Sequence, residues 1–297
     1  MMVWGDRISG RGARLVSRMS SLEKAYRRAP ITLRIGLAML GVWLITAVVG
    51  PLVLRADPTR IDIAEGYLLP PSPAHPFGTD NFGRDVFVRV VYGAMLDLQI
   101  GIFCAVPSFI IGTAIGLVAG YYGGLLDTIA MRLIDLLTAL PFIVLVIAIV
   151  SVLGPGIENM YLAVLVTGWI SYARVTRNTV KVIRNLDYVS AARVLGFSGP
   201  RILIGHILPN VIVTMVVLVT SSFVGYILLG SALGFLGLGV IPPTPEWGGM
   251  IADGRQYLRA APWIAFFPGV AVVWAGAAML LFGDGLADQL RTEENRQ

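Results

Sequence analysis

Charged residues are scarce in this chain. Only 14% of its 297 residues are charged, whereas a soluble domain of ordinary composition carries about 25%. Hydrophobic residues make up 56%, and the mean hydropathy is +0.76. A soluble globule of this size needs a larger charged surface than 23 basic and 18 acidic side chains provide. The composition therefore argues against a soluble enzyme and against a disordered protein, and it predicts a membrane protein.

Cysteine, histidine and lysine are nearly absent. The single cysteine, Cys104, lies in an apolar run, so a disulfide framework or a cysteine-based metal cluster is not available. The two histidines, His75 and His206, lie outside the centres of the apolar runs, which argues against an enzyme embedded in the membrane. Neither Lys24 nor Lys181 lies in the G-x-x-x-x-G-K pattern of a phosphate-binding loop. We therefore predict no catalytic residues, no metal site and no cofactor in this chain.

Uncharged apolar runs predict membrane-spanning helices, because a helix needs about 20 apolar residues to cross a bilayer. Six runs are present, and the fourth is the shortest: 35–54, 98–126, 136–153, 160–173, 207–241 and 260–283. The first run is longer than the ~7–15-residue core of a signal peptide, so we expect an uncleaved anchor. Pro107, Pro141 and Pro268 lie inside runs and are expected to kink them. The predicted fold class is an all-α membrane protein with six transmembrane helices.

The positions of Lys and Arg predict the orientation of these helices. Residues 1–34 hold eight of the 23 basic residues, and the segment between the fourth and fifth runs holds six. With six spans, 17 basic residues fall on the side of the termini and six on the other side. This bias places both termini in the cytoplasm. It also accounts for the net charge of +5 without nucleic-acid binding, which we do not predict.

The basic leader, residues 1–29, has two interpretations. Arg7, Arg11, Arg14 and Arg18 recur at helical spacing, which suits a helix lying on the anionic inner leaflet. Alternatively, the leader is a disordered tail that only sets the topology.

The predicted spans lack ionisable groups. The second, fourth, fifth and sixth runs carry no charged residue or histidine at their centres. Proton- and ion-coupled carriers bind and move charge through such groups, so their absence disfavours a self-powered secondary transporter. A secondary transporter or channel is still the alternative function, because Na⁺ sites can be built from backbone carbonyls.

Glycines recur at four-residue spacing in two of the runs. This spacing lets two helix backbones approach closely. The facing surface is either another helix of this chain or a second membrane subunit. The glycines concerned are Gly112, Gly116, Gly120, Gly230 and Gly234.

A short helix is predicted between the fourth and fifth spans. Asp187 is suited to cap the N-terminus of a helix over 188–195, and Gly196 is suited to end it. Such a helix either docks in the groove of a partner or rests on the lipid. The residues available for docking are small or apolar: Ala191, Ala192, Val194, Leu195 and Phe197.

This segment resembles the EAA loop of ATP-binding-cassette (ABC) importer permeases, whose pattern is E-A-A-x3-G-x9-I-x-L-P. The chain has Ser190-Ala191-Ala192, Gly196 and Leu208-Pro209 at the matching spacing. Ser190 replaces the glutamate of the pattern, and His206 replaces the isoleucine. Ser190 falls at the third position of the predicted helix, where a glutamate would close a capping box. The resemblance implies that the helix, with Tyr188, contacts a cytoplasmic ATPase subunit and that loop 179–206 couples the two.

Further motifs resemble the C-type permeases of the dipeptide/oligopeptide/nickel family. They are HPFGTDNFGRD at 75–85, VYGA at 91–94, GYYGG at 120–124, LGPG at 153–156, LGFLGLG at 233–239, PPTPEWG at 242–248 and GDGLAD at 283–288. The resemblance covers about residues 30–291 and leaves 292–297 as a cytoplasmic tail. It implies the type I ABC importer permease architecture in a bacterial inner membrane.

The same resemblance implies what this chain works with. Expected partners are a second homologous permease, two ATPase subunits that carry ATP and Mg²⁺, and an extracytoplasmic substrate-binding protein. The implied cargo is a peptide, and dipeptide, longer peptide, glutathione-like thiol and nickel chelate all stay open.

Two external segments are expected to be structural or to contact the binding protein. In the predicted external loop, 55–97, Asp80 or Asp85 is expected to pair with Arg84, within a turn-rich stretch that is structural rather than a substrate contact. His75 is expected to be a loop residue rather than a metal ligand. The loop with Pro243 and Trp247 either meets the binding protein or packs as a cap. The residues of the first stretch are Gly78, Thr79, Asp80, Gly83, Arg84 and Asp85.

Overall fold

The computed structural model describes residues 29–294, and every regular element in that range is helical apart from an isolated bridge between Thr79 and Asp85. The predicted leader and the end of the tail, residues 1–28 and 295–297, lie outside the described residues. The elements in chain order are α2 (Ile31–Leu54), α3 (Ile63–Gly66), α4 (Val86–Tyr122), α5 (Gly124–Leu137), α6 (Phe142–Leu153), α7 (Ile157–Thr167), α8 (Trp169–Ile183), α9 (Asp187–Val194), α10 (Gly199–Ile202), a π-helical turn (Leu203–Ile207), α11 (Leu208–Phe235), α12 (Trp247–Gly254), a 3₁₀ turn (Arg255–Tyr257) and α13 (Trp263–Glu294).

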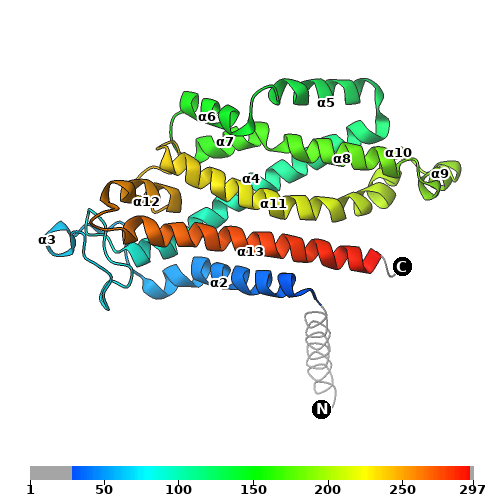
Figure 1. The fold of residues 1–297 in the computed structure, drawn as a ribbon. Coiled ribbons are helices and arrows are strands. Elements are labelled where there is room, and N and C mark those ends of the chain that lie inside the picture. The colour runs from blue at the N-terminus through cyan, green and yellow to red at the C-terminus, as the bar shows by residue number, and fades with distance from the viewer. Residues whose placement is uncertain (1–28, 295–297) are drawn as a thin grey trace, which may run out of the picture.

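The long helices lie alongside one another, and the connections gather at two ends (Figure 1). The short helix α9 lies at one end, together with the start of α2 and the end of α13. Helices α3 and α12 lie at the other end. This arrangement places the predicted coupling helix on the same side as both ends of the described chain, which agrees with the predicted orientation.

Within residues 29–294, four helices are long and apolar enough by themselves to cross a membrane: Ile31–Leu54, Val86–Tyr122, Gly199–Phe235 and Trp263–Leu290. Helices α5 and α6 would make a fifth span, with a bend of 78° between them. The predicted fourth span falls on α7 and α8, two shorter helices that meet at Gly168. The all-α membrane fold is confirmed, and the count of six spans stays a prediction.

The second predicted span begins too late and ends too late. Helix α4 starts at Val86, where Asp85 caps it by accepting a hydrogen bond from the Val88 amide (3.0 Å), so the external loop ends at 85 and not at 97. Gly123, with φ of 68°, then separates α4 from α5. The apolar run was cut short at Asp97, which the structure buries completely within the protein. A charged residue interrupts an uncharged run even where protein, and not lipid, surrounds it, so the predicted span began after Asp97 although the helix begins before it.

The third predicted span, 136–153, is broken. Pro141 is the N-cap of α6 and follows the gap after Leu137, so the proline separates two helices and does not kink one. By contrast, Pro107 and Pro268 lie inside α4 and α13. Helix α8 also continues to Ile183, so the predicted loop 179–206 begins within a helix.

The five spaced glycines all face other parts of this chain. A methyl group added at Gly116 would lie 2.6 Å from the Ala173 carbonyl oxygen, and one at Gly120 would lie 2.8 Å from Val180 Cβ. Gly112 similarly faces α8, so α4 and α8 pack backbone to backbone along much of their length. Gly230 faces Ile100 on α4, and Gly234 faces the loop before α12.

Candidate functional site

Helix α9 begins one residue earlier than predicted. Leu186 is its N-cap, with extended backbone (φ −74°, ψ 151°), and no side chain caps the helix. The predicted capping role of Asp187 is therefore wrong; its carboxylate lies in the first turn, where it still favours the helix dipole. Ser190 becomes the fourth helical residue, and its amide donates to the Leu186 carbonyl (3.1 Å). A glutamate at position 190 would therefore not be at the third helical position that a capping box requires.

The C-terminal end of α9 is closed by Gly196. The helix ends at Val194, and Gly196 adopts a positive φ of 81°. Its amide donates to the Arg193 carbonyl (3.0 Å), and the Phe197 amide donates to the Ala192 carbonyl (3.1 Å). This pair of bonds is the Schellman motif, which glycine favours because it lacks a Cβ. The prediction that Gly196 ends this helix is confirmed.

The predicted docking residues divide between two faces. Ala192 and Val189 are buried against the chain itself, in a cluster with Ile202 and other apolar residues. Ala192 is therefore not available to a partner, contrary to the prediction, because the helix turns it toward α10 and the π-helical turn. Other predicted residues are exposed or only partly buried: Asp187, Tyr188, Ser190, Ala191, Val194, Leu195, Gly196, Phe197, Leu208 and Pro209.

Val194 and Leu195 form the exposed apolar tip of α9, with 88% and 73% of their surfaces exposed. Apolar side chains this exposed at the solvent end of a membrane protein are typical of a contact surface.

Pro209 lies at the start of α11, directly after the π-helical turn, and its missing amide hydrogen accounts for the irregular turn before it.

Helix α9 follows a well-anchored helix. Arg184, at the end of α8, donates to the carbonyl oxygens of Gly120 (2.9 Å) and Tyr121 (3.2 Å) on α4. Asp127 on α5 pairs with Arg177 and with Lys181 (2.9 Å) on α8. These contacts tie the helix that precedes α9 to α4 and α5.

The external loop is held by a buried ion pair. Arg84 Nε lies 2.6 Å from Asp80 Oδ2, and both side chains are at most 5% exposed. Asp85, the other predicted partner of Arg84, instead caps α4 and lies 2.8 Å from His75 Nδ1. The glycine-rich stretch is largely buried, with Thr79 fully so. These residues support the loop.

Breaking this ion pair is expected to destabilise the fold strongly. Asp80→Asn leaves the buried Arg84 guanidinium without its carboxylate, which typically costs about 3–5 kcal/mol. Asp253→Asn is the matched control, because Asp253 is 44% exposed and 3.8 Å from Arg84, so its loss should cost at most about 1 kcal/mol. Thermal unfolding in detergent measures both. Equal shifts in melting temperature for the two variants would contradict the assignment.

The loop before α12 packs as a cap. Trp247 is buried; its indole donates to the Val90 carbonyl (3.0 Å) and its amide to Asp97 Oδ2 (3.3 Å). The Pro243 carbonyl accepts from Arg89 (3.1 Å). Trp247 thus anchors the loop to α4, whereas Pro243 itself is exposed.

Glu246 was missed by the sequence analysis although it organises this cap. Its two carboxylate oxygens accept the amides of Gly248 and Gly249 (2.7 Å each) and so cap α12. Burial raises the pKa of Glu246, and the two amide hydrogen bonds oppose that shift. The only sequence signal was an acidic residue two residues before the first of two glycines, which does not distinguish a buried cap from a surface charge.

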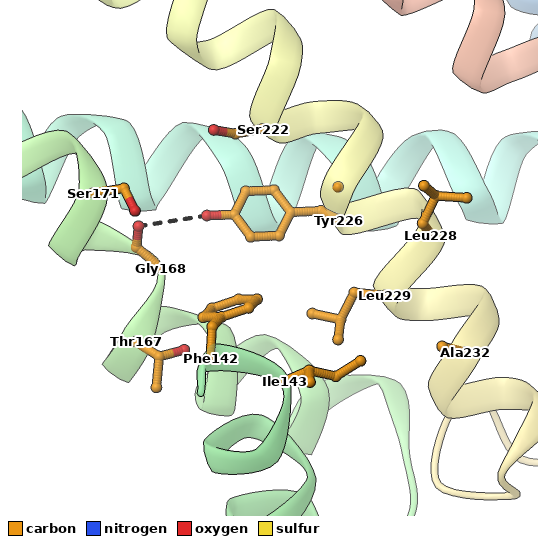
Figure 2. A pocket seen from close by; sticks show the side chains of 11 residues that line it. Phe142, Ile143, Thr167, Gly168, Ser171, Ser222, Tyr226, Leu228, Leu229 and Ala232 are labelled. Carbon is orange, nitrogen blue, oxygen red and sulfur yellow. Dashed lines mark hydrogen bonds between the residues drawn. The ribbon is translucent and has the colours of Figure 1, made fainter. Parts of the chain in front are cut away.

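A cavity of about 500 Å³ lies between α6, the junction of α7 and α8, and α11 (Figure 2). Its walls are mostly apolar, with Phe142, Ile143 and Leu229 among them. Hydroxyl groups of Ser171, Ser222 and Tyr226 also line it, and no Asp, Glu, Lys, Arg or His does. The cavity could not be predicted from the sequence, because its walls come from three separate parts of the chain.

Among residues 29–294, no group of three or more His, Cys, Asp or Glu side chains is placed to hold a metal ion. The described helices, the exposed helix α9 and the capped loop at the opposite end define a multi-pass membrane protein. The fold resembles a solved structure, an inward-facing conformation of the MetNI methionine ABC transporter, with a TM-score of 0.54 and 17% identity over 68% of this chain and 96% of that chain.

The chain belongs to the family of binding-protein-dependent transport system inner membrane components, whose model matches residues 112–292. It is 40% identical to a dipeptide transport system permease protein DppC of Alkalihalophilus pseudofirmus, over 86% of this chain and 84% of the relative. It is 38% identical to the DppC of Haemophilus influenzae, over 86% and 88% of the two chains. A glutathione transport system permease protein GsiD of Pectobacterium atrosepticum is 41% identical over 74% of this chain and 73% of its own. The chain is therefore a multi-pass inner-membrane permease subunit of an ABC importer and not an enzyme.

Proposed function

We propose that this permease carries peptides, and that di- and oligopeptides are its cargo. The observation that supports the cargo is the identity of about 40% to dipeptide permeases over more than four-fifths of both chains. The chain supplies one half of the passage, and a second homologous permease supplies the other. An extracytoplasmic binding protein delivers the peptide, and two ATPase subunits hold ATP and Mg²⁺.

We infer that α9 couples the passage to the ATPases. Closure of the ATPase dimer displaces α9 through its exposed apolar tip, Val194 and Leu195. Because Arg184 and Asp127 tie α8 to α4 and α5, the displacement reaches these two helices as well. The permease itself needs no chemistry for this step, which agrees with the uncharged centres of its long helices.

Uptake by the reconstituted importer tests the cargo. Proteoliposomes that contain the complete complex with its binding protein outside should accumulate radiolabelled alanyl-alanine only when ATP and Mg²⁺ are enclosed. Excess oligopeptide, glutathione and a nickel chelate, added separately, rank the alternative cargoes by competition. Uptake driven by an ion gradient without ATP would instead establish a secondary transporter.

A further inference from the structure

We propose that the cavity of Figure 2 is a transit site for the peptide main chain, with Ser171, Ser222 and Tyr226 as its hydrogen-bonding residues. This inference rests on the proposed peptide cargo and assigns to it a place inside the permease. The cavity is open on one side, and its volume falls within the ~300–1,000 Å³ of small-ligand sites.

The polar groups of the cavity converge from two walls. Ser222 and Tyr226 are four residues apart on α11 and therefore share a face, with Gly225 beside them. On the opposite wall α7 ends and α8 begins at Gly168, one turn before Ser171. Figure 2 shows the Tyr226 hydroxyl directed at the Gly168 carbonyl, at a donor–acceptor distance of 3.5 Å. This distance is long for an O–H···O hydrogen bond, and the Ser108 hydroxyl is a second polar group beside Tyr226.

The chemistry of the walls selects an uncharged polar chain over lipid. Peptide N–H and C=O groups can form hydrogen bonds with the hydroxyl groups of the walls, whereas acyl chains cannot, so these walls suit a peptide better than lipid. The apolar walls, Phe142, Ile143 and Leu229, accept side chains of varied shape. The absence of charge at the walls keeps binding weak, which transit requires because the cargo must also leave.

The cavity is also placed to respond to the ATPases. Its two polar walls belong to α8 and α11, which are the helices on either side of α9 in the chain. A displacement of α9 therefore changes the separation of Ser171 from Ser222, and so opens or closes the site. A packing defect elsewhere in the bundle would not have walls on the two helices that flank α9 in the chain.

Filling the cavity tests the proposal. Gly225→Phe adds a ring to a residue that lines the cavity, at a position where nothing lies within 4 Å of an added Cβ. We expect alanyl-alanine uptake to fall at least about tenfold while the complex assembles and binding protein still stimulates its ATPase. Gly269→Phe is the matched control: it also has open space around its Cβ but lies on α13, away from the cavity, and should transport normally.

The hydroxyl groups are tested by a second pair of variants. Ser222→Ala combined with Tyr226→Phe should lower uptake roughly fivefold or more at unchanged ATPase activity. The control is Ser221→Ala, whose hydroxyl bonds to its own helix at Val217 and does not line the cavity.

Each outcome decides the matter. Normal uptake by Gly225→Phe would overturn the proposal and indicate that the cavity is open to lipid. Loss of the second permease from that variant would also overturn it and indicate that the cavity is a packing surface. If the wild-type complex takes up no peptide, the proposed cargo is wrong. If the wild-type complex and Gly225→Phe both take up peptide normally, the cargo stands and the transit site is wrong.

Discussion

Leu195→Asp is expected to abolish ATP-driven uptake while leaving the permease folded. Leu195 is 73% exposed at the tip of α9, so a carboxylate there costs little in the isolated chain. In the groove of an ATPase the same carboxylate would lose its water without gaining a partner. Central apolar contacts of this kind are worth about 2 kcal/mol or more, so association should weaken roughly 30-fold. Co-purification of the ATPase subunits and peptide-stimulated ATP hydrolysis measure the effect.

Two control variants separate coupling from general damage. Leu195→Met keeps an apolar side chain and should retain uptake. Val182→Asp places the same charge at an apolar position that is 67% exposed on α8, outside α9, and should retain the ATPases. If Leu195→Asp still couples like wild type, or if Val182→Asp is equally defective, α9 is not the coupling contact and the helix rests on lipid.

Gly116→Val is expected to prevent stable packing of α4 on α8. A Cβ at this position would lie 2.6 Å from the Ala173 carbonyl oxygen and 2.6 Å from Thr176 Cβ. A backbone carbonyl within a helix cannot move aside, so the two helices must separate along their contact. Overpacking typically costs about 1–3 kcal/mol, and separation of the longest helix contact places this case at or above the upper end. Size-exclusion chromatography and thermal unfolding in detergent measure the loss.

Gly41→Val provides the matched control in another membrane helix. Nothing lies within 4 Å of a Cβ at Gly41, so only the intrinsic helix preference changes, and valine is there slightly better than glycine. We expect a melting temperature close to that of wild type. Similar instability of the two variants would show that α4 and α8 do not meet through their glycines.

Local signals were sufficient for the ends of several elements. Gly196 was recognised as the end of α9 because a glycine after a short helical pattern suits a positive φ, and its φ is 81°. Asp187 was misjudged as the cap, since the choice between Leu186 and Asp187 depends on where the backbone leaves its extended form. A shift of one residue also changed which position Ser190 occupies.

The external end shows why burial was not predictable. From the sequence, Arg84 was expected to pair with either Asp80 or Asp85, since both acidic residues lie within four residues of the arginine. The structure selects Asp80 because Asp85 is taken by the first turn of α4 and by His75. Asp97 was not recognised, because it accepts a hydrogen bond from the Trp247 amide, 150 positions away. Glu246 was not recognised either, because its hydrogen bonds to the amides of Gly248 and Gly249 are local and give no sign that it is buried.

The sequence alone determined that this protein is a helical membrane permease with a short helix between two spans. Composition, apolar run length and local motifs are properties of neighbouring residues, and these suffice to set membrane insertion and helix ends. Only the tertiary structure decided that Ala192 faces inward while Val194 and Leu195 face outward, that Gly116 packs on α8, and that Ser222 and Tyr226 line a cavity. The physical reason is that burial depends on contacts between distant segments, and a sequence of apolar residues on all sides of a helix does not say which side meets protein and which meets lipid.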